Sequence, residues 1–290
     1  MEDLDGFRQR LEGRFDGLTK SQRQIATYLL GSYDEAAFLP AADLARRLGV
    51  SEATVVRGAR ALGYDGFPEL RRSLQELFLG KVTPATRLRR KLADLRDGHV
   101  LARTIEMEVQ YLTEALHGIH PADFDRAVEI VLRGRRVFAF GLGPARILPE
   151  MVEIRLRRFG MPTTSMTESG RDLLEKLVLL EKDDAVLAMG FFRVTAELMA
   201  VLDHARSLGC RTVLITDTLH LALKNKADVI LAARRGPVSA FHSLTVPMTI
   251  LNALILAVAI ARPEQSLTSL DRLQKLRAAS GLDALVKEFA

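Results

Sequence analysis

The feature that most constrains the fold of this chain is a series of short apolar runs in its second half. The runs are VFAFG (137–141), AVLAMG (185–190), TVLIT (212–216) and VILAA (229–233), and amphipathic segments of helical length separate them. PTTSM (162–166) is expected to form a further short strand. Near-continuous apolar strands between helices are typical of a parallel sheet buried on both faces. We therefore predict an α/β domain in this half.

The first eighty residues have a different pattern, in which apolar residues recur at helical spacing. One helix is expected to end at Gly49, and the next to begin after Ser51 as its N-cap and to stop at Gly63. Thr19 is a candidate cap for an earlier helix, and Pro68 suits the first turn of a later one. This region is predicted to be an all-α domain.

The chain has 290 residues, a length that favours two domains. We predict a helical domain at 1–80, a linker at 81–100 and an α/β domain at 101–290. The net charges of these three parts are −1, +4 and +2, so neither domain is strongly basic. The local distribution of charge says more about DNA binding than the net charge does, because residues 46–72 hold six arginines against three acidic residues.

Three observations limit the class of protein. Cys210 is the only cysteine, which excludes an internal disulfide, and its apolar surroundings predict a buried filler rather than a nucleophile. The N-terminus lacks the apolar core of a signal peptide, so we expect a cytoplasmic location. The apolar stretch 244–261 is interrupted by Thr245, Pro247, Thr249 and Asn252, and we predict a helix buried on most faces rather than a membrane span.

The segment LARRLGVSEATVVRGARALG combines a helix, a glycine turn and a second capped helix, which is the helix-turn-helix pattern. Its apolar residues Leu44, Ala45, Leu48, Val50, Val55 and Leu62 can pack the two helices together. Ser51, Glu52, Thr54, Arg57 and Arg60 then remain on or near the outer face of the second helix. The N-terminus of that helix would face DNA phosphate, and Arg57 would reach a base edge or a phosphate. The alternative is a plain helical hairpin with a solvated charged face.

A second motif, VFAFGLGPARILPEM, predicts a strand, a glycine-rich turn and a helix. Gly141 and Gly143 permit a tight turn, and Pro144 suits a first helical turn. The N–H groups of Ala145 and Arg146 would face outward at the positive end of the helix dipole, where an anion binds favourably. The dinucleotide spacing is incomplete, because its third glycine would fall on Arg146. The alternative is a tight turn without a ligand.

Most of residues 5–79 resemble the N-terminal domain of RpiR-type transcription regulators. The run GVSEATVVR followed by LGYDGFPELR carries the resemblance. It implies a double-stranded DNA operator as partner, and the predicted DNA contacts are Lys20, Ser21, Arg23, Ser51, Glu52, Thr54, Arg57, Arg60 and Tyr64. One departure is Gly58, where family members usually have an aromatic residue. A helical glycine costs about 0.5–1 kcal/mol relative to alanine, and the missing ring removes core packing.

Residues from about 120 to 277 resemble a SIS (sugar isomerase) domain, through FGLG, AVLAMGFFRVTAEL, LITD, ADVIL and the helix after AFHSL. The resemblance implies a five-stranded parallel sheet with flavodoxin-like layering and a phosphosugar site at the carboxyl ends of the strands. The serine-rich phosphate loop of the family is replaced by GFFRVT. We therefore predict a small anionic effector, a phosphosugar or sugar acid, contacted by Gly141, Gly143, Pro144, Ala145, Arg146, Glu168, Phe191, Arg193, Thr195 and His242.

These motifs together predict a DNA-binding regulator that senses a metabolite, forms a homodimer or homotetramer, and has no cofactor, metal or membrane partner. His117 and His120 form an i, i+3 pair, but no cysteine or carboxylate cluster completes a metal site. Glu168 and His242 are the best acid–base candidates, yet no nucleophile accompanies them, so no catalytic residue and no enzymatic activity are predicted. Two alternatives remain: a sugar-phosphate isomerase with an added helical module, and a SIS domain that only dimerises.

Overall fold

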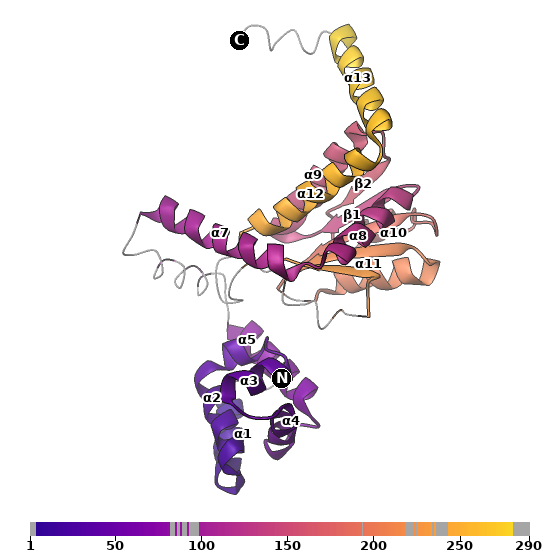
Figure 1. The fold of residues 1–290 in the computed structure, drawn as a ribbon. Helices are drawn as coiled ribbons and strands as arrows, with labels where there is room; N and C mark the ends of the chain where they lie inside the picture. Colours follow the sequence, from indigo (N-terminus) through magenta and orange to yellow (C-terminus); the bar gives the residue numbers. More distant parts are fainter. Residues whose placement is uncertain are drawn as a thin grey trace. The chain divides into compact units, whose positions relative to one another are not determined.

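The computed structural model describes residues 4–81, 99–192, 194–217, 225–233 and 243–280, with the single residues 85, 88, 92, 223 and 235. The chain divides into two compact units (Figure 1), formed chiefly by Met1–Val100 and by Leu101–Arg235 with Ser243–Ala290. Each unit has a hydrophobic core of its own.

The first unit is helical. Its elements are α1 (Leu4–Arg14), a short 3-10 helix η1 (Phe15–Gly17), α2 (Lys20–Ala36), α3 (Ala41–Leu48), α4 (Glu52–Ala61) and α5 (Phe67–Lys81). Its core contains Phe7, Ile25, Leu44, Val55 and Leu62, all fully buried. The apolar residues that recur at helical spacing along the sequence therefore meet in one core.

The predicted helix ends are confirmed in this unit. Gly49 follows α3 with a φ of 63°, and the Ser51 hydroxyl accepts a 3.1 Å hydrogen bond from the Thr54 N–H at the start of α4. Thr19 and Gln22 form a reciprocal cap before α2: the Gln22 N–H donates to Thr19 Oγ1 at 3.4 Å, and the Thr19 N–H donates to Gln22 Oε1 at 2.9 Å. This pattern satisfies backbone donors that the first turn of a helix leaves without partners.

The second unit alternates helices and strands. Its elements are α7 (Val100–Gly118), α8 (Pro121–Arg133), β1 (Val137–Gly141), the 3-10 helix η2 (Gly143–Arg146), α9 (Ile147–Arg158), β2 (Thr163–Met166), α10 (Arg171–Leu177), β3 (Ala185–Gly190), α11 (Ala196–Leu208), β4 (Arg211–Thr216), β5 (Val229–Ala232), α12 (Thr245–Ala261) and α13 (Pro263–Ser280). All five predicted strands are present, within one residue of their expected bounds.

The strands form one parallel sheet in the order β2-β1-β3-β4-β5, which confirms the predicted α/β fold. In register, Val137 of β1 lies opposite Thr163 of β2 and Ala185 of β3. The connections after β1 and β3 therefore leave the sheet beside each other. This arrangement creates a switch point at the carboxyl ends of β1 and β3, where open α/β sheets bind ligands.

Helices cover both faces of the sheet (Figure 1). One core joins α7, α8, α9 and α12 to one face, and a second core joins α10 and α11 to the other. Alternate residues of each strand enter the two cores: Ala139 and Leu187 point to the first, and Phe140 and Ala188 to the second. Burial on both faces explains why the strands have near-continuous apolar sequences.

The apolar stretch 244–261 forms α12, and the prediction that it is buried on most faces is confirmed, with one exposed stripe that includes Leu256 and Ile260. Leu251, Leu254 and Val258 are fully buried, whereas Leu256 is 61% exposed and Ile260 is 78% exposed. In the described part of the chain no single helix is long and apolar enough to cross a membrane. Only α12 and α13 together reach that length and composition, and they are bent by 102°.

Cys210 is the buried filler that its sequence context predicts. It is 4% exposed, and its Sγ donates to the Glu181 carbonyl at 3.0 Å. Burial raises the pKa of the Cys210 thiol to about 11. The reactive thiolate is therefore disfavoured at neutral pH.

Candidate DNA-reading and effector sites

The outer face of α4 presents a row of polar side chains at its N-terminus. The Ser51 and Thr54 hydroxyls are 2.7 Å apart, and the Arg57 guanidinium donates to Thr54 Oγ1 at 3.4 Å. The spacing of three residues places these side chains on one helix face. Ser51, Glu52 and Arg57 are exposed. The row combines hydroxyl donors, a cation and the positive end of a helix dipole, a set that suits a phosphate backbone.

The other predicted DNA contacts have different surroundings. Lys20 and Arg23 are exposed and Ser21 is half-buried, all in the first turn of α2. Arg23 Nη2 donates to the Asp16 carbonyl at 2.9 Å, and Arg60 Nε donates to the Asp65 carbonyl at 3.3 Å.

Tyr64 differs from the rest of the predicted set, because its side chain belongs to the core. It is 5% exposed, and its hydroxyl lies 3.5 Å from that of Ser73. A ring so deeply buried stabilises the domain rather than offering a surface to DNA. We therefore leave Tyr64 out of the proposed interface.

Gly58 lies on the buried face of α4, against α2. A Cβ atom at this position would lie 3.0 Å from Ile25 Cδ1. Ile25 is fully buried. In this chain Ile25 fills space beside α4, and a ring at position 58 would collide with it. The missing aromatic residue is therefore compensated by packing from the neighbouring helix.

The glycine turn after β1 is required by the backbone. A Cβ atom on Gly141 would lie 3.1 Å from Pro149 Cδ and 3.2 Å from the Ala145 carbonyl oxygen. Gly143 has a φ of +58°, a conformation that residues with a Cβ rarely adopt. The two glycines allow the chain to turn tightly from β1 into η2, so the predicted tight turn is present.

The expected anion donors in this turn are not all available. The prediction that the Ala145 N–H faces outward is wrong, because it donates to the Leu142 carbonyl at 3.2 Å. Pro144 lies in η2 before α9, and the exposed Arg146 side chain pairs with Glu150 at 3.3 Å. The 3-10 turn folds the chain back on itself and consumes a donor that an immediate α-helical start would leave free.

Glu168 follows β2 and forms an ion pair. Its carboxylate accepts hydrogen bonds from Lys176 Nζ at 2.7 Å and from the Thr167 N–H at 2.9 Å. Burial raises the pKa of Glu168, but the hydrogen bonds from Lys176 and the backbone outweigh that effect and hold the pKa below its usual value. An ionised, paired carboxylate suits ligand orientation better than proton transfer at neutral pH.

The loop after β3 is attached to the end of β4. The Phe192 N–H donates to the two Asp217 carboxylate oxygens at 3.0 and 3.2 Å, and Phe192 has a φ of 72°. The Thr195 hydroxyl caps α11 by accepting the Leu198 N–H at 3.2 Å. Arg193 and His242, both predicted ligand contacts, lie outside the described residues.

The structure adds an ion pair at this edge that sequence reasoning missed. Arg235 Nη2 lies 2.8 Å from Asp217 Oδ2, and the two side chains are 7% and 6% exposed. The Arg235 guanidinium lies 4.1 Å from the centroid of the Phe191 ring. Asp217 comes directly after the predicted strand 212–216, and Arg235 comes two residues after the predicted strand 229–233. The rule that ligands bind at the carboxyl ends of parallel strands would have singled them out.

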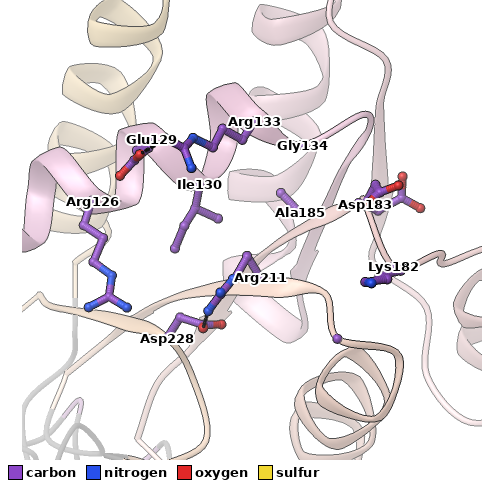
Figure 2. A pocket seen from close by; sticks show the side chains of 12 residues that line it. Arg126, Glu129, Ile130, Arg133, Gly134, Lys182, Asp183, Ala185, Arg211 and Asp228 are labelled. Carbon is purple, nitrogen blue, oxygen red and sulfur yellow. Dashed lines mark hydrogen bonds and ion pairs between the residues drawn. The ribbon is translucent and has the colours of Figure 1, made fainter.

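A hollow of about 500 Å³ lies at the other end of the strands (Figure 2). Its lining includes Arg211 with Asp228, 2.7 Å apart, and Arg133 with Glu129, 2.6 Å apart. The Arg211–Asp228 pair joins the amino end of β4 to the residue that precedes β5, whereas Arg133 and Glu129 pair within α8. The hollow is thus separate from the predicted effector site, and its charges are largely matched within the protein.

Comparison with known proteins agrees with this geometry. The helix-turn-helix domain of the rpiR family matches residues 6–79, and the SIS domain matches residues 131–257. An uncharacterized HTH-type transcriptional regulator of Haemophilus influenzae is 25% identical over 75% of this chain and 76% of its own length. The bifunctional protein glk of Paraburkholderia xenovorans is 27% identical over 95% of this chain, which spans only 43% of that protein.

Among solved structures, the Vibrio vulnificus NanR protein complexed with ManNAc-6P has a similar fold, with a TM-score of 0.64. The two are 23% identical, over 94% of this chain and 98% of that one. Fold and site therefore define a helix-turn-helix regulator with a C-terminal SIS domain. Its N-terminal domain is a helix-turn-helix domain of the rpiR family, and its C-terminal domain is a SIS domain.

Proposed function

We propose that this protein binds a DNA operator through α4 and that its SIS domain adjusts this binding in response to a small anionic metabolite. The observation that carries the proposal is the row Ser51–Thr54–Arg57 on the outer face of a capped helix after the Gly49 turn. In helix-turn-helix proteins this helix enters the major groove, with its first residues nearest the bases.

The DNA-binding proposal is tested with Arg57→Ala. Operator fragments are first selected from genomic DNA with the full-length protein, and affinities are then measured by fluorescence anisotropy over a salt series. We expect Arg57→Ala to weaken specific binding by about 1–3 kcal/mol because a base or phosphate contact is lost. Arg133→Ala removes the same charge from an exposed arginine of the other unit and should leave affinity unchanged.

If Arg57→Ala binds the operator with unchanged affinity at physiological salt, Arg57 is not part of the DNA interface. Failure of the wild-type protein to prefer any genomic fragment over scrambled DNA would contradict the regulator proposal itself. Specific binding by such proteins typically exceeds non-specific binding by about 10³-fold or more.

The effector proposal is supported by the switch point between β1 and β3 and by the charged groups at that edge. The similarly folded NanR protein was solved with ManNAc-6P, which makes phosphorylated sugars the first ligands to examine. An effector that binds one arrangement of the dimer more tightly would shift operator affinity by that difference. We propose that the regulator acts in the cytoplasm as a homodimer, because two-fold symmetry matches paired operator half-sites.

The isomerase alternative is less well supported. Glu168 is held as a paired carboxylate, and the serine-rich phosphate loop is replaced by GFFRVT. Relatives that match 75% and 81% of this chain are named transcriptional regulators. Turnover of aldose or ketose phosphates by the purified protein would establish the alternative.

A further inference from the structure

Arg235 is a buried cation whose hydrogen bonding is incomplete. It is 7% exposed; its Nη2 pairs with Asp217 at 2.8 Å and its Nη1 donates to the Ser243 carbonyl at 3.4 Å. Its Nε is buried and has no hydrogen-bond partner in the described structure. A buried N–H without a partner is destabilising, and native structures satisfy nearly all such groups. The unsatisfied Nε–H therefore marks the position at which an oxygen atom from outside the chain would complete the hydrogen bonding of Arg235.

The guanidinium is held in a defined orientation. Phe191 lies against it at 4.1 Å, and Asp217 and Ser243 fix its other nitrogens. Because Asp217 also accepts the Phe192 N–H, the arrangement ties together the loop after β3, the end of β4 and the segment before α12. A planar guanidinium fixed in this way is preorganised to donate to a carboxylate or phosphate.

We infer that Arg235 is the residue that binds the anionic group of the effector, with its Nε–H donating to a carboxylate or phosphate oxygen. The inference rests on the proposed effector-sensing function and adds the residue and the ligand chemistry. It also differs from the sequence prediction, which assigned the anion to the glycine turn and to the loop after β3.

The Asp217 carboxylate competes with the anionic group of the effector for the Arg235 guanidinium. This carboxylate already accepts a hydrogen bond from the Arg235 guanidinium. An oxyanion that binds the same guanidinium therefore weakens the Asp217–Arg235 pair. Asp217 also holds Phe192, a non-glycine residue at a φ of 72° and hence in a sparsely populated conformation. Effector binding at Arg235 is thereby transmitted to the loop that leads into α11.

The inference is tested on the full-length protein with two probes, inorganic phosphate and gluconate, by isothermal titration calorimetry. Arg235→Lys keeps a cation beside Asp217 but removes the Nε–H, and we expect it to weaken probe binding by about 10-fold or more. Asp217→Asn removes the competing carboxylate, and we expect it to strengthen binding. Arg211→Lys, which alters the Arg211–Asp228 pair at the opposite ends of the strands, should bind like the wild type.

The opposite signs separate a ligand contact from a structural role, because a purely structural pair would weaken binding in both variants. Equal affinities of the wild type and Arg235→Lys, or no binding of either probe by the wild type, would overturn the inference. Preference for phosphate over gluconate, or the reverse, identifies the anionic group. Operator affinity measured on the same preparations keeps the two proposals distinct, since loss of DNA binding with intact Arg235-dependent anion binding contradicts only the proposed function.

Discussion

At the scale of single residues, Asp184 is a buried carboxylate just before β3 whose hydrogen bonds stabilise the fold. Its carboxylate accepts hydrogen bonds from Arg136 Nε at 3.0 Å and Nη2 at 2.6 Å, and from the Glu181 N–H at 2.8 Å. Burial raises the pKa of Asp184, but the Arg136 hydrogen bonds and the backbone outweigh it and hold the pKa below the ordinary value of 3.8. The pair joins the residues that precede β1 and β3.

We predict that Asp184→Asn lowers the free energy of unfolding at pH 7 by about 1.5–3 kcal/mol, the range for hydrogen bonds to charged groups. Because the folded-state pKa is depressed, this stabilisation is present above the unfolded value of 3.8 and is lost as the pH falls through the folded value. Urea denaturation from pH 7 to pH 3 should show the wild type approaching the variant at acid pH. The exposed Asp172→Asn is the control, and a pH-independent gap would contradict the ion-pair account.

At the scale of elements, the packing of α2 against α4 depends on the pair Ile25 and Gly58. Ile25 Cδ1 lies 3.0 Å from where a Cβ on Gly58 would be. We predict that Gly58→Phe, which restores the aromatic usual in the family, destabilises the helical unit by about 1–3 kcal/mol through overpacking.

The same substitution in an Ile25→Ala background should cost less, because the ring then enters the space that Ile25 leaves. A double-mutant cycle by urea denaturation measures this coupling, expected at about 0.5–3 kcal/mol. Gly13→Phe on α1 is the control, since nothing lies within 4 Å of a Cβ there. Strict additivity of Gly58→Phe and Ile25→Ala would show that the two positions do not share space.

At the scale of the whole molecule, the exposed apolar side of α12 and α13 is the surface that we expect to join two copies of the chain. Leu256, Ile260 and Leu267 are 61%, 78% and 62% exposed. Leu256 and Ile260 are four residues apart and therefore lie on one face of α12, and contiguous exposed apolar side chains are typical of interaction surfaces. Family resemblance also assigned dimerisation to SIS-domain helices, including the 244–261 stretch.

We predict that Ile260→Glu shifts the protein towards monomers, because a buried carboxylate at an apolar interface lacks a partner. Light scattering after size-exclusion chromatography measures the mass. Val178→Glu makes the same change at a 73% exposed residue after α10, on the other side of the sheet, and should leave the mass unchanged. If the Ile260→Glu variant keeps the mass of a dimer, the interface does not include this face of α12.

The sequence by itself determined the elements and their order. Strands buried on both faces need apolar runs, and helix ends need caps such as Ser51 and turns such as Gly49. Both features depend on residues that are close together in the sequence, so the local sequence predicts them. The outer row of α4 was predictable for the same reason, since helical periodicity alone decides which residues share a face.

Only the tertiary structure decided which side chains meet. The burial of Tyr64, the contact of Ile25 with Gly58, the internal hydrogen bond of the Ala145 N–H and the Asp217–Arg235 pair all depend on how the elements pack. Asp217 and Arg235 are 18 positions apart, and β5 lies between them. Their ion pair exists because parallel strands bring their carboxyl ends to one edge, a long-range consequence of the sheet that no local pattern encodes.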